Sequence, residues 1–254
     1  MEDKLKALGA FVKSSHYGHD RYDFKFNGYD AIIVFASNPA IGNVWGWRAR
    51  FWNHQGQIER ELLKAGFNLA YINTAIWYGS SNEVKIWNEF YSFLVKYFNF
   101  SPKPVLIGMS RGGLIIYNWA KRNPEKITAI YGDAPVCDFQ SWPGGKGVGT
   151  ASPNDYKMCL DAYSLTEEEA EIYADQPKDN LEALAAAGVP ILHVLGDADI
   201  VVPVGENSDV LVDNYRKVGG KARVISKPGC GHHPHSLKDP SPIVRFILTN
   251  TNPS

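Results

Sequence analysis

The chain has 254 residues, of which 44% are hydrophobic and 21% are charged, and its formal net charge is -1. Its length suits one large domain or two small ones, and its composition is that of a globular protein, which excludes wholesale disorder. Because 26 Lys and Arg residues balance 27 Asp and Glu residues, we expect neither nucleic acid nor an anionic membrane as a partner. Three cysteines are too few, and odd in number, for a disulfide framework.

The amino-terminal segment lacks the apolar core of a signal peptide, and nowhere does the sequence contain a run of about 18 apolar residues. We therefore expect a soluble cytoplasmic protein, or a periplasmic or secreted one if a signal peptide has been removed. The oligomeric state leaves no signal in the sequence.

Short apolar segments alternate with amphipathic ones along the chain. Strands are predicted at 22–26, 31–35, 67–72, 104–107, 127–131, 190–195 and 222–225, and helices at 58–64, 84–98, 114–120, 210–218 and 243–248. This alternation indicates an α/β fold with a doubly wound, mostly parallel sheet, covered by helices on both faces. The rhythm stops between about 134 and 188. We expect an insertion there to cover the carboxyl edge of the sheet like a lid, within a single domain that spans 1–254.

The segment Gly108-Met109-Ser110-Arg111-Gly112 has the pattern G-x-S-x-G between an apolar strand and an apolar helix. This context is typical of a tight turn that holds a serine in a strained conformation and lifts its hydroxyl above the sheet. Glycines flank the serine because the turn leaves no room for Cβ atoms. The pattern predicts Ser110 as a nucleophile, which needs a base to take its proton.

The base is expected to be a histidine late in the chain. A loop from Gly231 to His235 follows the last predicted strand, which places its histidines at the same sheet edge as Ser110. His232, directly after Gly231, is our choice, and His233 and His235 are the alternatives.

The carboxylate that orients the base should also follow a strand. Asp199 lies in a G-x-x-D-x-x-V-P segment after the strand at 190–195, and its role would be to fix the histidine tautomer. Asp197, directly after the strand glycine, is better suited to bracing the loop. Asp133, after the strand at 127–131, is a further alternative.

The chain order Ser110, Asp199, His232 resembles that of the α/β-hydrolase family. Over nearly its whole length the chain resembles the compact serine hydrolases of the dienelactone-hydrolase and prolyl-oligopeptidase-like kind. The resemblance implies catalysis through an acyl-enzyme, with no cofactor. Family members often carry a His-Gly pair after an early strand, where it builds the oxyanion hole, but this chain has the segment 35–39 there instead.

An oxyanion hole needs two hydrogen-bond donors aimed at the developing negative charge. The backbone N–H of Arg111, next after the nucleophile, is expected to be one. Ser37 or Asn38 is expected to supply the other, and the sequence does not separate them. Pro39 has no N–H and is excluded.

Aromatic and arginine residues follow several of the predicted strands. Indole rings stack on sugars or flat acyl groups, and an arginine binds a carboxylate in bidentate fashion. We therefore predict a small-molecule or oligosaccharide ester as substrate, either carbohydrate-linked or aromatic, with a uronic carboxylate as one option. The competing interpretation is that these side chains fill the core. The candidate substrate-binding residues are Trp45, Trp47, Arg48, Trp77 and Trp142.

Three rival functions follow from the same residues. His193, Asp197 and the late histidines offer enough ligands for zinc, but no His-x-x-x-His helix pair is present and we expect no metal site. The same triad cleaves amides, so a peptidase or amidase is an alternative. A ligand-binding protein that keeps the fold without catalysis is the alternative outside the enzymes.

Overall fold

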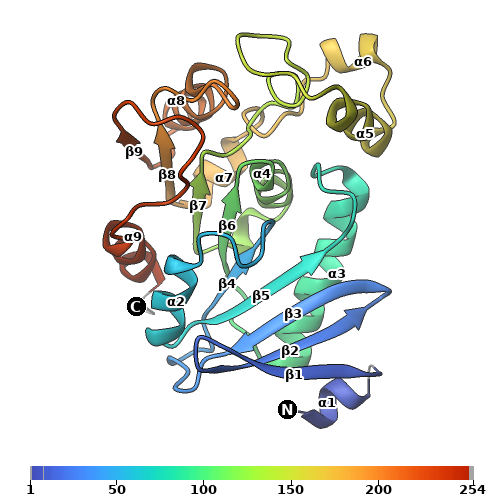
Figure 1. The fold of residues 1–254 in the computed structure, drawn as a ribbon, viewed down its shortest axis with the longest axis vertical. Coiled ribbons are helices and arrows are strands. Elements are labelled where there is room, and N and C mark those ends of the chain that lie inside the picture. Colours follow the sequence, from blue (N-terminus) through green and yellow to red (C-terminus); the bar gives the residue numbers. More distant parts are fainter. Residues whose placement is uncertain (1, 8, 252–254) are drawn as a thin grey trace.

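The computed structural model describes residues 2–7 and 9–251, and its strands form a nine-stranded sheet (Figure 1). The strands are β1 (Phe11–His16), β2 (His19–Phe26), β3 (Tyr29–Phe35), β4 (Trp45–Arg48), β5 (Asn68–Asn73), β6 (Val105–Met109), β7 (Ala129–Asp133), β8 (Ile191–Gly196) and β9 (Ala222–Lys227). The helices are α1 (Glu2–Lys6), α2 (Gln57–Lys64), α3 (Ser81–Phe98), α4 (Gly112–Arg122), α5 (Pro153–Tyr163), α6 (Glu167–Glu171), α7 (Glu182–Ala186), α8 (Ser208–Lys217) and α9 (Ser241–Thr251). Short 3₁₀ helices lie at Pro124–Lys126 and Val204–Glu206.

The spatial order of the strands is β1-β2-β3-β5-β4-β6-β7-β8-β9. From β5 to β9 every neighbouring pair is parallel, whereas β1, β2 and β3 form an antiparallel meander whose last strand pairs antiparallel with β5. The central strands β4, β6, β7 and β8 are buried along their whole length, as continuously apolar strands in a doubly covered sheet must be. The predicted mostly parallel, doubly wound sheet is confirmed.

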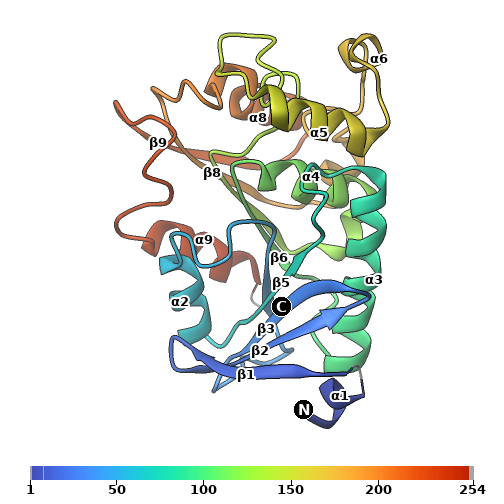
Figure 2. The same cartoon turned by 45° about the vertical axis from the view of Figure 1, so that its right-hand side comes forward.

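Helices cover the sheet on both faces. On one face α2 and α9 pack together over a mostly aliphatic core with side chains from β6, β7 and β8. On the other face α3, α4, α7 and α8 cover a larger core that is rich in aromatic rings (Figure 2). No helix among residues 2–7 and 9–251 is long and apolar enough to cross a membrane.

Local sequence explains where the helices α2 and α3 end. The buried side of α2 carries Ile58, Leu62 and Leu63 together with Glu59, while Arg60 and Lys64 are exposed. This helix ends just before Gly66, whose φ of 87° disfavours residues with a side chain. The helix α3 ends in the same way at Asn99, which has a left-handed conformation with φ 56°.

The sequence did not predict the strand β4. It is only four residues long, and both of its faces are buried, so no alternation of polar and apolar residues marks it. This strand lies between β5 and β6 and therefore borders the strand that leads to Ser110. The residues after β4, rather than those after β3, consequently reach the carboxyl edge of the sheet beside Ser110.

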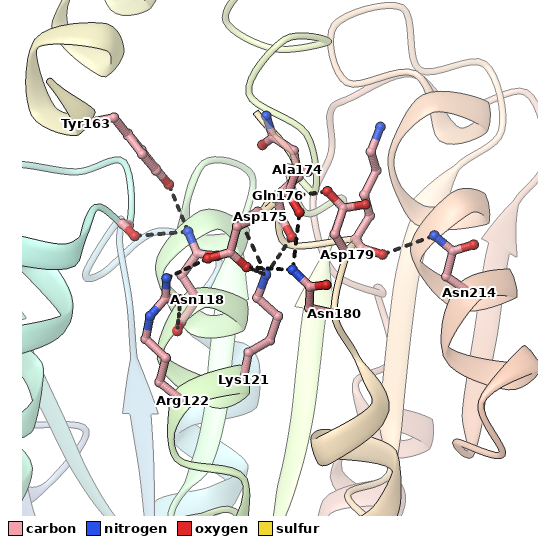
Figure 3. A network of polar contacts seen from close by, with 12 residues as sticks. Asn118, Lys121, Arg122, Tyr163, Ala174, Asp175, Gln176, Asp179, Asn180 and Asn214 are labelled. Atoms are coloured by element: carbon pink, nitrogen blue, oxygen red, sulfur yellow. Dashed lines mark hydrogen bonds and ion pairs between the residues drawn. The ribbon is translucent and has the colours of Figure 1, made fainter. Parts of the chain in front are cut away.

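The segment between β7 and β8 contains α5, α6 and α7, and α5 and α6 lie beyond the carboxyl ends of the strands (Figure 1). Figure 3 shows how residues 174–180 are joined to α4, the helix that follows the turn at Ser110. Asp175 accepts hydrogen bonds from Lys121 at 2.7 Å and from Arg122 at 2.7 Å. Asn118, also on α4, donates to the Tyr163 hydroxyl at 2.8 Å. These contacts fix the segment to α4. The lid role of this segment stays a prediction.

Candidate active site

Ser110 lies at the turn between β6 and α4, with a positive φ of 49°. Its N–H donates to the carbonyl oxygen of Asp133 at 2.9 Å, and its own carbonyl accepts from Gly113 and Val136, both at 2.9 Å. A non-glycine residue in this region of φ is strained and persists only where surrounding contacts hold it. The three hydrogen bonds provide that support, and the strained turn agrees with the expectation from sequence.

The need for glycine around this turn differs from position to position. A Cβ at Gly108 would clash with the Ile116 side chain, and one at Gly113 would lie 2.5 Å from the carbonyl oxygen of Val136. At Gly112 the nearest atoms would be 3.4 Å away, which is ordinary contact. Close packing therefore demands glycine at 108 and 113, and the glycine of the G-x-S-x-G pattern at 112 is not sterically required.

The structure brings Ser110, His232 and Asp199 together. The Ser110 Oγ lies 3.0 Å from the His232 Nε2, and the His232 Nδ1 lies 2.7 Å from the Asp199 Oδ2. The three residues come from loops after β6, β9 and β8, and each is less than a tenth exposed. This arrangement allows the imidazole to take a proton from the hydroxyl while the carboxylate holds the ring.

Asp199 is held in its ionised form by its surroundings. Burial alone would raise the pKa of this carboxyl group, but the hydrogen bond to His232 and those from the Val201 and Val202 N–H groups, each 2.9 Å, outweigh that effect. The pKa therefore lies below its ordinary value of 3.8. An ionised Asp199 favours the tautomer of His232 in which Nδ1 carries the proton and Nε2 faces Ser110.

The alternatives for base and acid form a second buried pair. The His235 Nδ1 lies 3.2 Å from the Asp133 Oδ1, and the Ser236 N–H donates to the Asp133 Oδ2 at 2.8 Å. The His235 and His232 rings are 4.7 Å apart between centroids. Asp133 thus joins the Ser110 turn, through its backbone carbonyl, to the loop that carries His232. The sequence analysis named Asp133 and His235 as alternatives, but it did not predict that Asp133 bonds to both loops.

Two other candidates lie outside this centre. His233 is exposed. Asp197 accepts a hydrogen bond from the Gly229 N–H at 2.7 Å and so braces the loop, the role expected for it from sequence.

The expected oxyanion donors Ser37 and Asn38 are at the wrong edge of the sheet. The strand β3 is antiparallel to β5, with Val34 opposite Leu69, so the end of β3 lies beside the beginning of β5. The Ser37 N–H donates to His19 there. Because Ser110 lies at the carboxyl ends of the parallel strands, neither residue can reach it. The prediction is wrong, and its error is the direction assumed for β3.

The predicted substrate-binding role of Trp45, Trp47 and Arg48 is also wrong, because all three belong to the buried strand β4. Trp45 and Trp47 have no exposed surface, and the Trp47 ring stacks on Trp87 at 4.0 Å between centroids. Arg48 is 2% exposed and forms an ion pair with Glu59. The interpretation that these side chains fill the core is the correct one.

Arg48 nevertheless shapes the neighbourhood of Ser110. Its guanidinium group donates to the carbonyl oxygens of Arg50 at 2.7 Å, Phe51 at 3.2 Å and His54 at 3.0 Å. These bonds turn the backbone of residues 50–54 so that the carbonyl groups face inward. Within the described residues, neither the Arg50 N–H nor the Phe51 N–H donates a hydrogen bond. The loop therefore offers free donors next to β6, which the sequence analysis did not find.

Trp77 and Trp142 lie around the side chain of Arg111, the residue that follows Ser110. The Arg111 guanidinium carbon is 5.1 Å from the centre of the Trp142 ring and 5.9 Å from that of Trp77. Arg111 also forms an ion pair with Asp155 of α5 at 2.9 Å. Trp142 and Asp155 both belong to the segment between β7 and β8. That segment thus contributes side chains directly beside the Ser110 turn.

Among residues 2–7 and 9–251, no group of three His, Cys, Asp or Glu side chains is placed to hold a metal ion. His193 lies away from the triad, with its ring nitrogens in hydrogen bonds to Tyr117 and, at 3.0 Å, to Ser208. Burial lowers the pKa of His193 to about 3, so this ring is neutral.

No protein-family model matches the chain, and no curated protein matches it. Solved structures do. An acetyl xylan esterase from Thermoanaerobacterium has a TM-score of 0.63 and 13% identity, covering 98% of this chain and 91% of its own. An S-formylglutathione hydrolase from Agrobacterium tumefaciens has a TM-score of 0.62 and 14% identity, covering 94% of both chains. A puromycin hydrolase has a TM-score of 0.65 and 17% identity, covering 94% of this chain. The matched region is only 37% of the puromycin hydrolase chain.

These similarities, together with the strand order and the turn at Ser110, show that the chain has the α/β-hydrolase fold. The fold resemblance inferred from the sequence is confirmed. At such low identity the similarity establishes the fold alone, and function must be argued from the site.

Proposed function

We propose that the protein is a serine-dependent hydrolase that cleaves a carboxylic ester through an acyl-enzyme. The observation that carries the proposal is the pair of hydrogen bonds that links Asp199 through His232 to Ser110, at 2.7 and 3.0 Å. All three groups are buried at one sheet edge, where water does not compete with these bonds. No step requires a cofactor.

In the first half of the reaction, the Ser110 Oγ attacks the ester carbonyl carbon while its proton moves to the His232 Nε2. The imidazolium ion is stabilised by Asp199, which stays ionised because its pKa is lowered. The tetrahedral intermediate then collapses, and the alcohol leaves with the proton that His232 returns. In the second half, water attacks the acyl-enzyme with the same proton transfers, and the acid is released.

The developing oxyanion needs two donors. The Arg111 N–H is one, because it directly follows the nucleophile at the start of α4. We assign the second to the N–H of Arg50 or Phe51, in the loop that Arg48 holds beside the turn. Each such donor contributes about 3 kcal/mol to lowering the barrier.

A carbohydrate-linked or aromatic ester is the substrate class that we propose. Trp77 is half-buried and flanks Arg111 beside Ser110, whereas Trp142, on the same guanidinium group, is buried in the core of the segment between β7 and β8. Indole rings in this position suit a flat or ring-shaped group next to the scissile bond. The acetyl xylan esterase among the similar structures is consistent with this class.

A substrate panel tests the proposal. Acetylated, methyl-esterified and feruloylated sugars are compared with short p-nitrophenyl esters and with amino-acid p-nitroanilides, for the wild type and for Ser110→Ala. We expect ester hydrolysis that Ser110→Ala abolishes. Hydrolysis of plain acyl esters alone would contradict the sugar or aromatic substrate, and preference for the anilides would indicate the peptidase alternative. Activity that survives in Ser110→Ala would overturn the mechanism.

A further inference from the structure

Arg50 is a half-buried cation without a carboxylate partner among the described residues. The other described arginines either form an ion pair, as Arg48 and Arg111 do, or are exposed. The Arg50 Nε is buried and has no acceptor within the described residues, and its Nη1 makes a long contact of 3.3 Å with the Asn73 Oδ1. A guanidinium removed from water normally has a charged or strongly accepting partner.

The position of Arg50 connects this cation with the candidate active site. A Cβ on Gly112, two residues after Ser110, would lie 3.4 Å from the Cβ of Arg50. From there the side chain reaches Asn73 at the end of β5, and its guanidinium carbon lies 4.5 Å from the centre of the Trp77 ring. Burial, with a further contribution from the charge of Arg111, lowers the pKa of Arg50. The charged form of Arg50 is therefore destabilised, and an anion beside it would offset that destabilisation.

We propose that Arg50 binds a free carboxylate of the substrate, so that the preferred ester carries a second, ionised acid group. This inference rests on the hydrolase function proposed above. Neighbouring strands are about 4.8 Å apart, which places a cation between β4 and β5 about 5 to 10 Å from the acyl carbon bound at Ser110. Three or four carbon atoms that end in a carboxylate span that distance when the hydrogen bond from the carboxylate to the guanidinium is included. The carboxylate belongs either to the acyl group, as in a half-ester of a dicarboxylic acid, or to the alcohol, as in a uronate.

Two pairs of esters test the proposal and locate the carboxylate. In umbelliferyl glutarate and umbelliferyl pentanoate the acyl chains are equally long and differ in one terminal carboxylate. Propyl butanoate and the butanoyl ester of hydroxypropanoate differ in the same way on the alcohol side. We expect the wild type to prefer the anionic member of one pair, as measured by the ratio of the two kcat/KM values.

Variants at Arg50 show whether this side chain produces the preference. Arg50→Gln is expected to lower the anionic-to-neutral ratio about tenfold to a hundredfold, because a charge-assisted hydrogen bond is lost. Arg50→Lys should restore part of it. The matched control is Arg223→Gln, which removes the same charge from an exposed position on β9 and should leave the ratio unchanged. A ratio that Arg50→Gln does not change would overturn the inference while the hydrolase proposal stands.

Binding to Ser110→Ala separates failure of the inference from failure of the chemistry. Calorimetry with the four esters should show tighter binding of one anionic ester, and the double variant Ser110→Ala, Arg50→Gln should lose that difference. Equal binding of anionic and neutral esters would contradict the role of Arg50. If none of the four esters were hydrolysed and a fluorophosphonate failed to label Ser110, the hydrolase proposal would fall and the inference with it.

Discussion

The two flanks of Ser110 differ in how their charged and titratable side chains are paired. On the flank toward β7 and β8, both ring nitrogens of His232 and both carboxylate oxygens of Asp199 have hydrogen-bond partners. On the flank toward β4 and β5, the Nε atoms of Arg50 and Arg111 are buried and have none within the described residues. The first flank thus aligns an imidazole between a hydroxyl and a carboxylate, while the second holds the Arg50 cation without a carboxylate partner among the described residues.

This difference follows from what each flank does in the proposed mechanism. Proton transfer is fast only when the groups are already aligned, since reorganising them would add to the barrier. Groups that recognise a substrate gain from being unpaired, because the substrate then forms bonds that water or the protein does not offer. Variants on the first flank should therefore change kcat, and variants on the second should change selectivity.

The largest effect is expected from the catalytic pairs. His232→Gln and Asp199→Asn should each lower kcat about ten-thousand-fold with little change in KM, because the proton acceptor or its orientation is lost. His233→Gln, which alters an exposed histidine one residue away, is the control and should stay near the wild-type rate. Steady-state kinetics on an ester from the panel measures the effect. Retention of a tenth of the wild-type kcat by either triad variant would contradict the assignment.

The buried ion pair behind the second flank should give the next largest effect. Glu59→Gln leaves the Arg48 charge buried without a counter-ion, and we expect the free energy of unfolding to fall by about 3 to 5 kcal/mol. Glu61→Gln removes a carboxylate from an exposed pair with Lys64 and should cost less than about 1 kcal/mol. Urea unfolding of the two variants measures the difference. Equal losses of unfolding free energy in the two variants would show that the buried charge of Arg48 does not depend on Glu59 as its counter-ion.

A smaller effect is expected where Asp133 joins the two loops of the first flank. Asp133→Asn keeps the shape but weakens the bonds to His235 and the Ser236 N–H, so we expect a loss of about 1 to 3 kcal/mol in stability. The His232 loop should then be less well placed, with kcat reduced about tenfold and KM retained. Asp197→Asn, at the exposed brace of the same loop, is the control. A raised KM with an unchanged kcat would contradict this role of Asp133.

The pH dependence of stability gives the smallest effect. The pKa of Asp199 is lower in the folded chain than its ordinary value of 3.8, so its ionised form stabilises the fold at neutral pH. That stabilisation is lost as the pH falls through the folded-state pKa. Asp199→Asn should therefore be less stable than the wild type at pH 7, and the gap should close below about pH 4. A gap of constant size in urea unfolding at both pH values would contradict the lowered pKa.

The sequence was sufficient to predict that Ser110, Asp199 and His232 come together, because the argument needed only local signals. Ser110, Asp199 and His232 each follow an apolar strand, and the carboxyl ends of parallel strands meet at one edge of the sheet. Knowing that the strands are parallel was enough to bring three distant segments together, without knowing their order.

The loop at 50–54, to which we assign the second oxyanion donor, could not be predicted in this way. The direction of β3 is set by its pairing with β5, and β4 has no pattern of its own because both faces are buried. The roles of Arg48 and Arg50 depend on where Glu59 of α2 lies in space, which no local pattern records. The sequence analysis therefore selected Arg48 as the substrate-binding arginine, although Arg48 is paired with Glu59 and it is Arg50 that has no carboxylate partner among the described residues.

Labelling of the folded wild-type protein with a fluorophosphonate tests the central claim most directly. We predict a single phosphonylated residue, Ser110, identified by mass spectrometry, and much slower labelling of His232→Gln because the hydroxyl then has no base. Folded protein that stays unlabelled, or carries the adduct on a different residue, would contradict the account.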